Sequence, residues 1–446
     1  MIHQVDDERE AIVALAQQLV QIPSINTGFM PTGNETAVCE FARDWLATDE
    51  IESDIFEAIP GRGNLIAKIS GRSGKGGLMF MSHTDVVPVE DVSKWRFPPF
   101  SATIDNDRIY GRGSSDCKGL LAAHMAAMRI IKRNNLLLKD NLILATAADE
   151  EHGGRYGFKW MIENHPEKIM APHAVNEGAG ENVNLDGGLV YVLGVGEKGR
   201  LQVEIEFKGN SAHASTPWKG TNAAFPLSQT LERIKNYDSE RDTSLQLFEH
   251  LSTFAIEQKA SPENIDEIIS TVNQSNPPLA SLLMALSRMT ITPTMIKGGI
   301  KSNSVPETIK LTCDVRTLPH QNESYVEQEL LGILAGIPDV DFSIDYMAEP
   351  NASEFETEFV EQIKQSTGTA LNLNNIQWAP GISTGFTDSR FTRQLGVDTY
   401  GLHLFHPEDN PTLLNIHGTD ESEGIKSIIS GAKIFVALAY DLLAIK

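Results

Sequence analysis

Three short clusters of carboxylate and histidine residues follow apolar runs and could bind metal ions. They read SHTDVVP after LMFM, ADEEHGG after LILAT, and NEG after HAV. Runs of this length are typical of buried strands, and ligands of open parallel sheets bind at the carboxyl ends of the strands. Nitrogen and oxygen donors of these types suit divalent cations such as zinc. The clusters therefore predict a metal site at one edge of a sheet.

His83 and Asp85 are separated by one residue on a segment that we expect to be extended, so both side chains lie on one face. Asp85 could then accept one imidazole N–H while the other nitrogen of His83 binds a metal. Surface and capping residues also form such triplets, and this pair alone does not define a site.

Glu150 and Glu151 are adjacent carboxylates directly after an apolar run. Burying two such charges is costly unless metal ions or hydrogen bonds compensate them. One of them could bind metal while the other transfers protons. The alternative is that both residues begin the next helix, where acidic residues are favoured in the first turn.

Asp116 lies in the Gly/Ser-rich turn GRGSSDCKG, before an expected helix. The turn lacks the third glycine of a dinucleotide-binding fingerprint. We interpret Cys117 as a residue at the start of the helix and not as a nucleophile, because no base is assigned to it. His417, in NIHGTDES, lies where an apolar run meets a glycine turn, and on its own it could equally be a capping or core histidine.

Nine motifs in this order resemble one known group of proteins. These motifs are HTDVVP, GRGSSDCKG, ADEEHGG, NEG, KGNSAHASTPWKGTNA, GGIKSNSVPE, DVRTLP, TDSR and IHGTDES. They are similar to those of the zinc-dependent family of aminoacylases, acetylornithine deacetylase, succinyl-diaminopimelate desuccinylase and glutamate carboxypeptidase. The resemblance extends from the first expected helix to the last.

The resemblance implies two Zn²⁺ ions per chain, with Co²⁺ or Mn²⁺ as possible substitutes. His83 and Glu177 would bind one ion, and Glu151 and His417 would bind the other. Asp116 would bridge the two. These donors agree with the chemistry of a dimetal site, which can acidify a shared water.

The resemblance also assigns two roles beside the ligands. Glu150 would be the general base that takes a proton from the zinc-bound water and passes it to the leaving nitrogen. Asp85 would be the carboxylate that accepts the imidazole N–H of His83 that faces away from the metal. The peptide bond that follows Asp116 is expected to be cis, as it is in the family.

Further motifs of the resemblance imply contacts with the substrate. His213, in SAHASTP, corresponds to a residue that reaches the substrate carbonyl, often across a dimer interface. Asn303 and Arg316 match positions that contact the substrate, and the guanidinium of Arg316 suits a free α-carboxylate. Thr387 and Arg390, in TDSR, are candidates for the same end of the ligand.

The function that the resemblance implies is metal-dependent hydrolysis of the amide bond of an N-acyl amino acid or of a short peptide with a free carboxylate. A dipeptidase or carboxypeptidase instead of a deacylase is one alternative. A non-catalytic metal-binding relative that acts in binding or assembly is another. An aminopeptidase is disfavoured. Such an enzyme needs a carboxylate to bind the amine of its substrate, whereas Arg316 carries a positive charge.

The composition narrows the partners and the compartment. Lys and Arg number 37 against 60 for Asp and Glu, a net charge of −23, which disfavours nucleic acid and anionic membranes as partners. Three widely spaced cysteines without a CxxC pair favour a reducing compartment. Because the N-terminus does not resemble a signal peptide, we expect a cytoplasmic enzyme. We expect its partner to be a small-molecule substrate.

The elements that must position these residues alternate between strand-like and helix-like runs up to about residue 197 and again from 349. This alternation predicts an α/β domain, with a mostly parallel sheet and helices on both faces, of the zinc exopeptidase type. Between these parts, strands such as LQVEIEF alternate apolar and polar residues. We therefore expect a catalytic domain of residues 1–197 and 349–446, interrupted by an α+β lid of residues 198–348. The resemblance implies a homodimer that forms through this lid.

Overall fold

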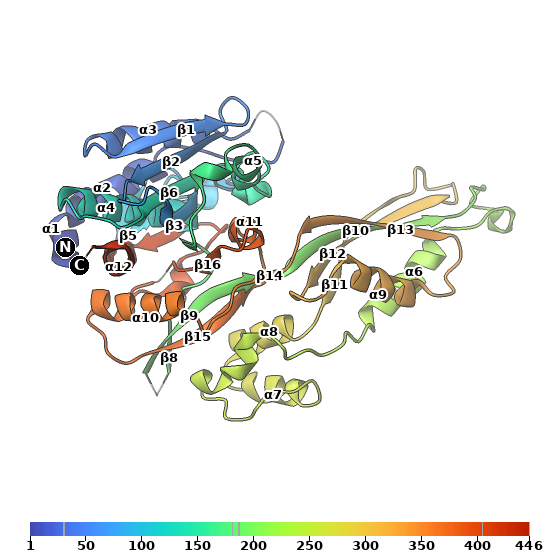
Figure 1. Ribbon diagram of the computed structural model, residues 1–446. Coiled ribbons are helices and arrows are strands. Elements are labelled where there is room, and N and C mark those ends of the chain that lie inside the picture. The colour runs from blue at the N-terminus through green and yellow to red at the C-terminus, as the bar shows by residue number, and fades with distance from the viewer. Residues whose placement is uncertain (30–31, 181, 186–187, 404, 446) are drawn as a thin grey trace.

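The computed structural model describes residues 1–29, 32–180, 182–185, 188–403 and 405–445. Figure 1 shows a rounded domain that contains both termini and an arm that extends away from it. We call these two parts the catalytic domain and the arm. None of the helices in the described ranges is long and apolar enough to cross a membrane.

The catalytic domain is built on one large sheet with the strand order β1-β2-β6-β3-β7-β16-β9-β14, and β15 and β8 also pair with β9. The central strands β6, β3, β7 and β16 pair in parallel, as β15 does with β9, whereas β1, β2, β8 and β14 pair antiparallel with their neighbours. The bounds are β1 (Glu52–Glu57), β2 (Gly63–Ile69), β3 (Gly76–His83), β6 (Asn141–Ala147), β7 (His173–Asn176), β8 (Asn182–Leu185), β9 (Gly188–Glu197), β14 (Asn351–Ala352), β15 (Ile376–Ser383) and β16 (Asp398–Gly401). The α/β fold with a mostly parallel central sheet is therefore confirmed.

Helices cover both faces of this sheet. The larger core lies on one face, under α1 (Ile2–Asp7), α2 (Arg9–Val20), α3 (Glu35–Ala47), α4 (Gly119–Arg133), α10 (Glu358–Leu371) and α12 (Ile425–Leu443). Because α4 and α12 are apolar around most of their circumference, they are the most buried of these helices. A smaller core lies on the other face, under α5 (Phe158–Asn164) and α11 (Ser389–Gln394).

A small three-stranded sheet joins two segments that are far apart in the sequence. It has the order β17-β5-β4, formed by β4 (Thr103–Asp105), β5 (Arg108–Tyr110) and β17 (Ser422–Gly424). The turn with Asp116 follows β5, and the loop with His417 precedes β17. The pairing of β5 with β17 therefore brings the two residues to the same place. The Asp116–Cys117 peptide is cis, as expected.

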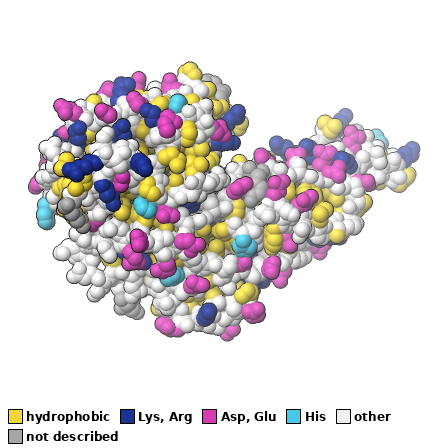
Figure 2. Space-filling view, in the orientation of Figure 1, with side chains coloured by type: hydrophobic (Ala, Val, Ile, Leu, Met, Phe, Trp, Pro, Cys, Tyr) yellow, Lys and Arg dark blue, Asp and Glu magenta, His cyan; other side chains and the backbone are white. Residues whose placement is uncertain are grey.

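The arm is a four-stranded antiparallel sheet with the order β11-β12-β10-β13 and two helices on one face. Its elements are β10 (Gly199–Lys208), α6 (Ala224–Lys235), β11 (Thr290–Gly298), β12 (Thr308–Thr317), α9 (Glu323–Leu334) and β13 (Val340–Ala348). These elements enclose a hydrophobic core of their own. Figure 2 shows Asp and Glu side chains on both the catalytic domain and the arm, as the negative net charge requires.

The stretch between α6 and β11 packs differently from the rest of the arm. It contains the short helices η6 (Gln246–Glu249) and η7 (Leu251–Phe254), then α7 (Ile265–Val272) and α8 (Pro277–Leu286). Its apolar side chains belong to the core of the catalytic domain, not to the core of the arm. We call residues 245–286 the helical segment. The domain boundaries at 197/198 and 348/349 stay a prediction.

Candidate active site

The three clusters that follow apolar runs come together at the carboxyl ends of neighbouring strands. His83 is the last residue of β3, Glu150 and Glu151 follow β6, and Glu177 follows β7. Because β6, β3 and β7 are adjacent and parallel, their carboxyl ends meet at one edge of the sheet. The sheet therefore places these side chains beside one another.

The two histidines and their carboxylates form two groups that share Asp116. The Nε2 atom of His83 lies 2.8 Å from Asp116 Oδ1 and 3.4 Å from Glu177 Oε2. The Nε2 atom of His417 lies 3.0 Å from Asp116 Oδ2 and 3.0 Å from Glu151 Oε2. Each oxygen of the Asp116 carboxylate thus faces one histidine.

This donor set fits a pair of divalent cations. Imidazole nitrogens and carboxylate oxygens are the usual ligands of catalytic zinc, and one shared carboxylate is what two neighbouring ions need. One oxygen or nitrogen from each of His83, Asp116 and Glu151 lies within 4.8 Å of the others. The Sγ of Cys117 also lies within 4.8 Å of possible ligand atoms of His83 and Glu177, but it accepts the His83 backbone N–H and is fully buried.

Electrostatics also favour bound cations, since the site gathers several carboxylates with few positive charges. Burial and the nearby charge of Glu177 raise the pKa of Glu150 well above its ordinary value. Burial and the charge of Asp116 raise the pKa of Glu151 to about 7, although His417 opposes this. Burial also raises the pKa of Asp388 to about 8. Divalent cations would compensate this concentration of negative charge.

Asp85 holds the loop that carries the two glutamates. Its carboxylate accepts the backbone N–H groups of Glu150 (3.1 Å) and Glu151 (3.2 Å) and the side-chain amide of Asn26 (2.9 Å). The Nδ1 atom of His83 lies 3.0 Å from the Asp85 backbone oxygen and 3.4 Å from its carboxylate. Asp85 therefore orients both the histidine and the neighbouring loop.

Glu421 plays a corresponding part on the other side of the site. Its Oε1 accepts the backbone N–H groups of Gly113 (3.0 Å), Ser115 (3.1 Å) and Asp116 (3.2 Å). Its Oε2 pairs with Arg112, which also donates to the backbone oxygens of His417 and Gly418. This fully buried glutamate thus connects the turn of Asp116 to the loop of His417.

An open cavity of about 960 Å³ exposes the site to ligands. Asp116, Glu150, Glu151, Glu177 and His417 all line it. A volume of this size accommodates a small-molecule substrate.

Two arginines line the same cavity near the junction of the arm. Asp314 accepts a hydrogen bond from the Nε atom of Arg200 (3.0 Å) and from that of Arg316 (2.6 Å). Arg316 also donates to the backbone oxygen of Thr384 (2.8 Å). Asp314 therefore holds two guanidinium groups at the cavity, where they could bind a carboxylate.

The two expected substrate contacts in TDSR are both occupied by protein partners. The Thr387 hydroxyl lines the cavity but donates to Glu197 Oε1 at 2.5 Å. Arg390 is buried, does not line the cavity, and donates to the backbone oxygen of Gly153 at 2.8 Å. Its guanidinium also packs against Phe386 and Phe391. Both side chains thus support the walls of the site.

His213 and Asn303 lie apart from the other expected residues. Both are exposed and lie beyond the ends of β10 and β11, at the end of the arm that is distal to the catalytic domain (Figure 1). The backbone of Ala214 donates to the Asn303 oxygen, so the two residues are neighbours. Neither lines the cavity of the metal ligands. A single chain in this conformation therefore does not bring them to the site.

The sequence analysis missed three residues that the fold brings to the site: His403, Arg200 and Glu421. The Nε2 atom of His403 lies 3.4 Å from Glu423 Oε1, and its ring lines the cavity. His403 comes just after the end of β16, and His83 is the last residue of β3. This position at a strand end could have indicated His403 as a site residue. Glu421 belongs to the motif IHGTDES, but the motif does not indicate that its partners are Gly113, Ser115 and Asp116. Arg200 carries no local signal, because its partner Asp314 is distant in the sequence.

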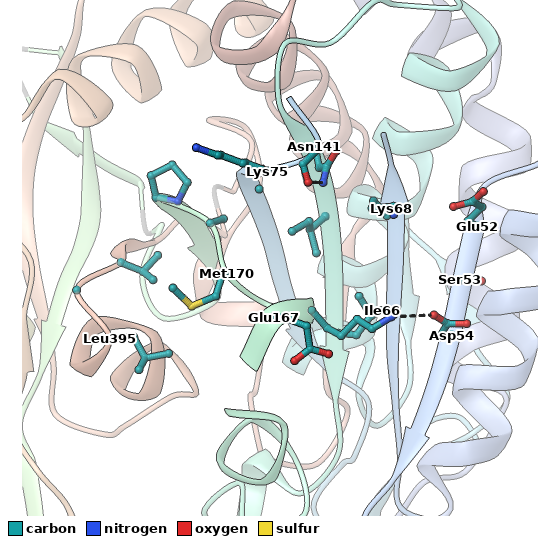
Figure 3. A pocket seen from close by; sticks show the side chains of 18 residues that line it. Glu52, Ser53, Asp54, Ile66, Lys68, Lys75, Asn141, Glu167, Met170 and Leu395 are labelled. Carbon is teal, nitrogen blue, oxygen red and sulfur yellow. Dashed lines mark hydrogen bonds and ion pairs between the residues drawn. The ribbon is translucent and has the colours of Figure 1, made fainter. Parts of the chain in front are cut away.

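A second cavity, of about 1090 Å³, lies elsewhere on the catalytic domain (Figure 3). It is lined by Gly76 and Asn141, the first residues of β3 and β6, and by an ion pair between Lys168 and Asp54. Because His83 ends the eight-residue strand β3, this cavity is about 20 Å from the metal ligands. It therefore takes no part in their chemistry.

Comparison with known proteins identifies the family of the chain. Residues 79–441 match the peptidase family M20/M25/M40, and the chain therefore belongs to that family. It is a metallohydrolase with candidate metal-binding residues.

Individual relatives cover nearly the whole chain. A probable succinyl-diaminopimelate desuccinylase of Staphylococcus aureus (strain MRSA252) is 26% identical over 420 residues, which are 93% of this chain and 93% of that protein. An M20 family metallo-carboxypeptidase from Sulfolobus solfataricus has a TM-score of 0.73 at 21% identity and covers 96% of this chain and 98% of its own. Human carnosine dipeptidase 1 has a TM-score of 0.69 at 16% identity, with coverage of 99% and 98%. The two solved structures share the fold.

Proposed function

We propose that this protein hydrolyses the amide bond of an N-acyl amino acid or of a short peptide with a free carboxylate. The observation that carries the proposal is the sharing of Asp116 between His83 and His417, each with a second carboxylate beside it. Glu150 lines the same cavity without a place in either group. This arrangement suits a dimetal hydrolase with a separate general base.

The five ligands would hold two Zn²⁺ ions. His83 and Glu177 would hold one, Glu151 and His417 the other, and Asp116 would bridge them. When bound, the ions would polarise the scissile carbonyl and acidify a water.

The remaining steps belong to side chains of the protein. Glu150 takes the proton of the attacking water and returns it to the leaving nitrogen, and its position in the cavity outside both ligand groups leaves its carboxylate available for these transfers. Arg316 binds the free carboxylate of the substrate. Arg200 lies beside it, because both arginines donate hydrogen bonds to Asp314. His213 contacts the substrate carbonyl once the distal end of an arm reaches the cavity, either from a second copy of the chain or by closure.

The names of the relatives support this substrate class. The S. aureus relative is named for the removal of a succinyl group, and the fold neighbours are a carboxypeptidase and a dipeptidase. All three names describe hydrolysis of an amide bond. We therefore place deacylation first and keep peptide hydrolysis as the second outcome of the same test.

The test is a substrate screen of protein loaded with Zn²⁺, Co²⁺ or Mn²⁺. N-acetyl and N-succinyl amino acids are compared with dipeptides, each with a free α-carboxylate and again as the matched carboxamide. We expect hydrolysis of at least one carboxylate substrate and weaker hydrolysis of its carboxamide. The reason is that the carboxamide lacks the negative charge that Arg316 and Arg200 would bind. Absence of metal-dependent amide hydrolysis across the screen would contradict the proposal.

A further inference from the structure

The helical segment forms part of the wall of the metal site, although it lies between two elements of the arm in the sequence. Leu247, Phe254, Leu279 and Leu282 line the cavity that is also lined by Glu150 and by four of the five proposed ligands, Asp116, Glu151, Glu177 and His417. Leu279 and Leu282 are three residues apart on α8 and therefore lie on one face of this helix. The segment thus turns several apolar side chains toward the place where the reaction occurs.

The exposed fractions of the α8 side chains distinguish those that line the cavity from those that pack in the core. Ala280, Leu283 and Leu286 of α8 are at most 2% exposed and pack into the core of the catalytic domain. Leu279 and Leu282 are only partly buried, at the edge of that core. The helix therefore buries one row of side chains and leaves a second row open to the cavity.

Hydrogen bonds fix the segment to the catalytic domain. The buried Lys198, between β9 and β10, donates its Nζ to the backbone oxygens of Ala285 (2.6 Å) and Arg288 (2.8 Å) at the end of α8. At the other end of the segment, the Gln246 side chain donates to the backbone oxygen of Ser353 and accepts from the backbone N–H of Phe355. The apolar row is thus held in place against the site.

The catalytic domain adds apolar residues to the same lining. Val192, Ile382 and Phe405 line the cavity, and the helical segment packs directly on β15, the strand that contains Ile382. The cavity thus combines charged groups, those of the proposed metal ligands, Glu150 and the arginines, with apolar side chains. Binding an apolar group against these side chains would remove its surface from water and favour substrates that carry one.

We propose that the helical segment forms an apolar subsite, and that the substrate carries a large apolar group next to the scissile amide. This inference rests on the proposed amide hydrolysis. The group is either the acyl chain or the side chain of the amino acid, since both flank the bond. Leu279 and Leu282 are then residues that determine specificity.

The experiment compares kcat/KM for three compounds with the metal-loaded protein. N-acetylglycine carries neither apolar group, N-octanoylglycine carries an apolar acyl chain, and N-acetylphenylalanine carries an apolar side chain. We expect one of the last two to exceed N-acetylglycine by about tenfold or more, which is the scale of discrimination that an apolar pocket supplies. The preferred compound tells which side of the amide occupies the subsite.

Variants then assign the preference to α8. The double variant L279A/L282A should reduce the ratio between the preferred compound and N-acetylglycine about tenfold, and L282W, which fills the subsite, should reduce it as well. Met284 is exposed on the same helix and does not line the cavity, so M284A should keep the wild-type ratio.

Each other result overturns the apolar subsite alone or both proposals. Equal kcat/KM for the three compounds, or a ratio that α8 variants leave unchanged, overturns the apolar subsite while amide hydrolysis stands. Hydrolysis of none of these compounds, nor of any in the wider screen, overturns the proposed function and the subsite with it.

Discussion

The carboxyl edge of the central sheet and the distal end of the arm are organised in opposite ways. At the sheet edge, His83, Asp116 and Glu177 are largely buried and in mutual contact, and Asp85 and Glu421 hold the loops around them. At the distal end of the arm, the side chains of His213 and Asn303 are exposed.

This difference indicates a division of labour within the fold. The sheet edge is assembled before any substrate arrives, which suits metal binding and proton transfer. The distal end presents polar groups that would act only when an arm meets a cavity. On the proposed function, the catalytic domain would supply the chemistry, and an arm would complete the contact with the substrate.

The largest effect should come from the sheet edge. Glu150→Ala should lower kcat by about 10²–10⁴-fold, because it removes the proposed general base. Metal content, measured by atomic emission, should remain that of the wild type, since Glu150 is in neither ligand group. Glu163→Gln, an exposed glutamate of α5, is the matched control and should keep full activity. Near-normal turnover of the Glu150 variant would show that another residue is the base.

The next largest effect should come from the distal end of the arm. His213→Ala should lower kcat/KM by about 10²–10³-fold, the usual cost of a lost donor to the developing oxyanion. Its melting temperature should not change, because the side chain is exposed. His3→Ala, also exposed, serves as the control. Activity within twofold of the wild type would exclude the distal end from the reaction.

Mixing two inactive variants would sharpen the comparison further. If His213 acts on the site of a second copy, Glu150→Ala and His213→Ala chains that are unfolded and refolded together should recover activity. The recovery arises because a mixed dimer contains one site with both residues. Absence of recovery, with mixed dimers shown by mass spectrometry, would favour closure of the arm within one chain.

A smaller effect should follow from loosening the sheet edge itself. Glu421→Gln should weaken metal affinity about 10–100-fold, as the loss of residues that orient ligands typically does. The reason is that the loops of Asp116 and His417 lose their shared carboxylate. Glu408→Gln, in the same connection between β16 and β17 but exposed, is the control. Unchanged affinity in a competitive chelator titration would contradict this role.

Much of the fold could be predicted from the sequence, because the signals for it are local. Apolar runs followed by carboxylates predict strand ends, and Glu150, Glu151 and Glu177 occupy such ends. Alternating apolar residues such as those of LQVEIEF predict the half-exposed strands of the arm, and β10 forms there.

The rest of the site depends on contacts that no local pattern contains. Glu421 accepts from the backbone of Asp116, 305 residues away, and of Gly113, 308 residues away. The helical segment follows α6 of the arm in the sequence but packs on the catalytic domain. Its helical periodicity indicates an apolar face and not the domain that this face contacts. The protein partners of Thr387 and Arg390 could not be predicted for the same reason. A motif does not indicate which atoms its side chains contact.

The central claim is that one chain holds two metal ions through five residues at the sheet edge. Anomalous diffraction at the zinc edge, from crystals of zinc-loaded protein, tests this directly. The account predicts two peaks about 3.5–4 Å apart on either side of Asp116. One should lie beside His83 and Glu177, and the other beside Glu151 and His417. A single peak, or peaks that do not contact these residues, would contradict it.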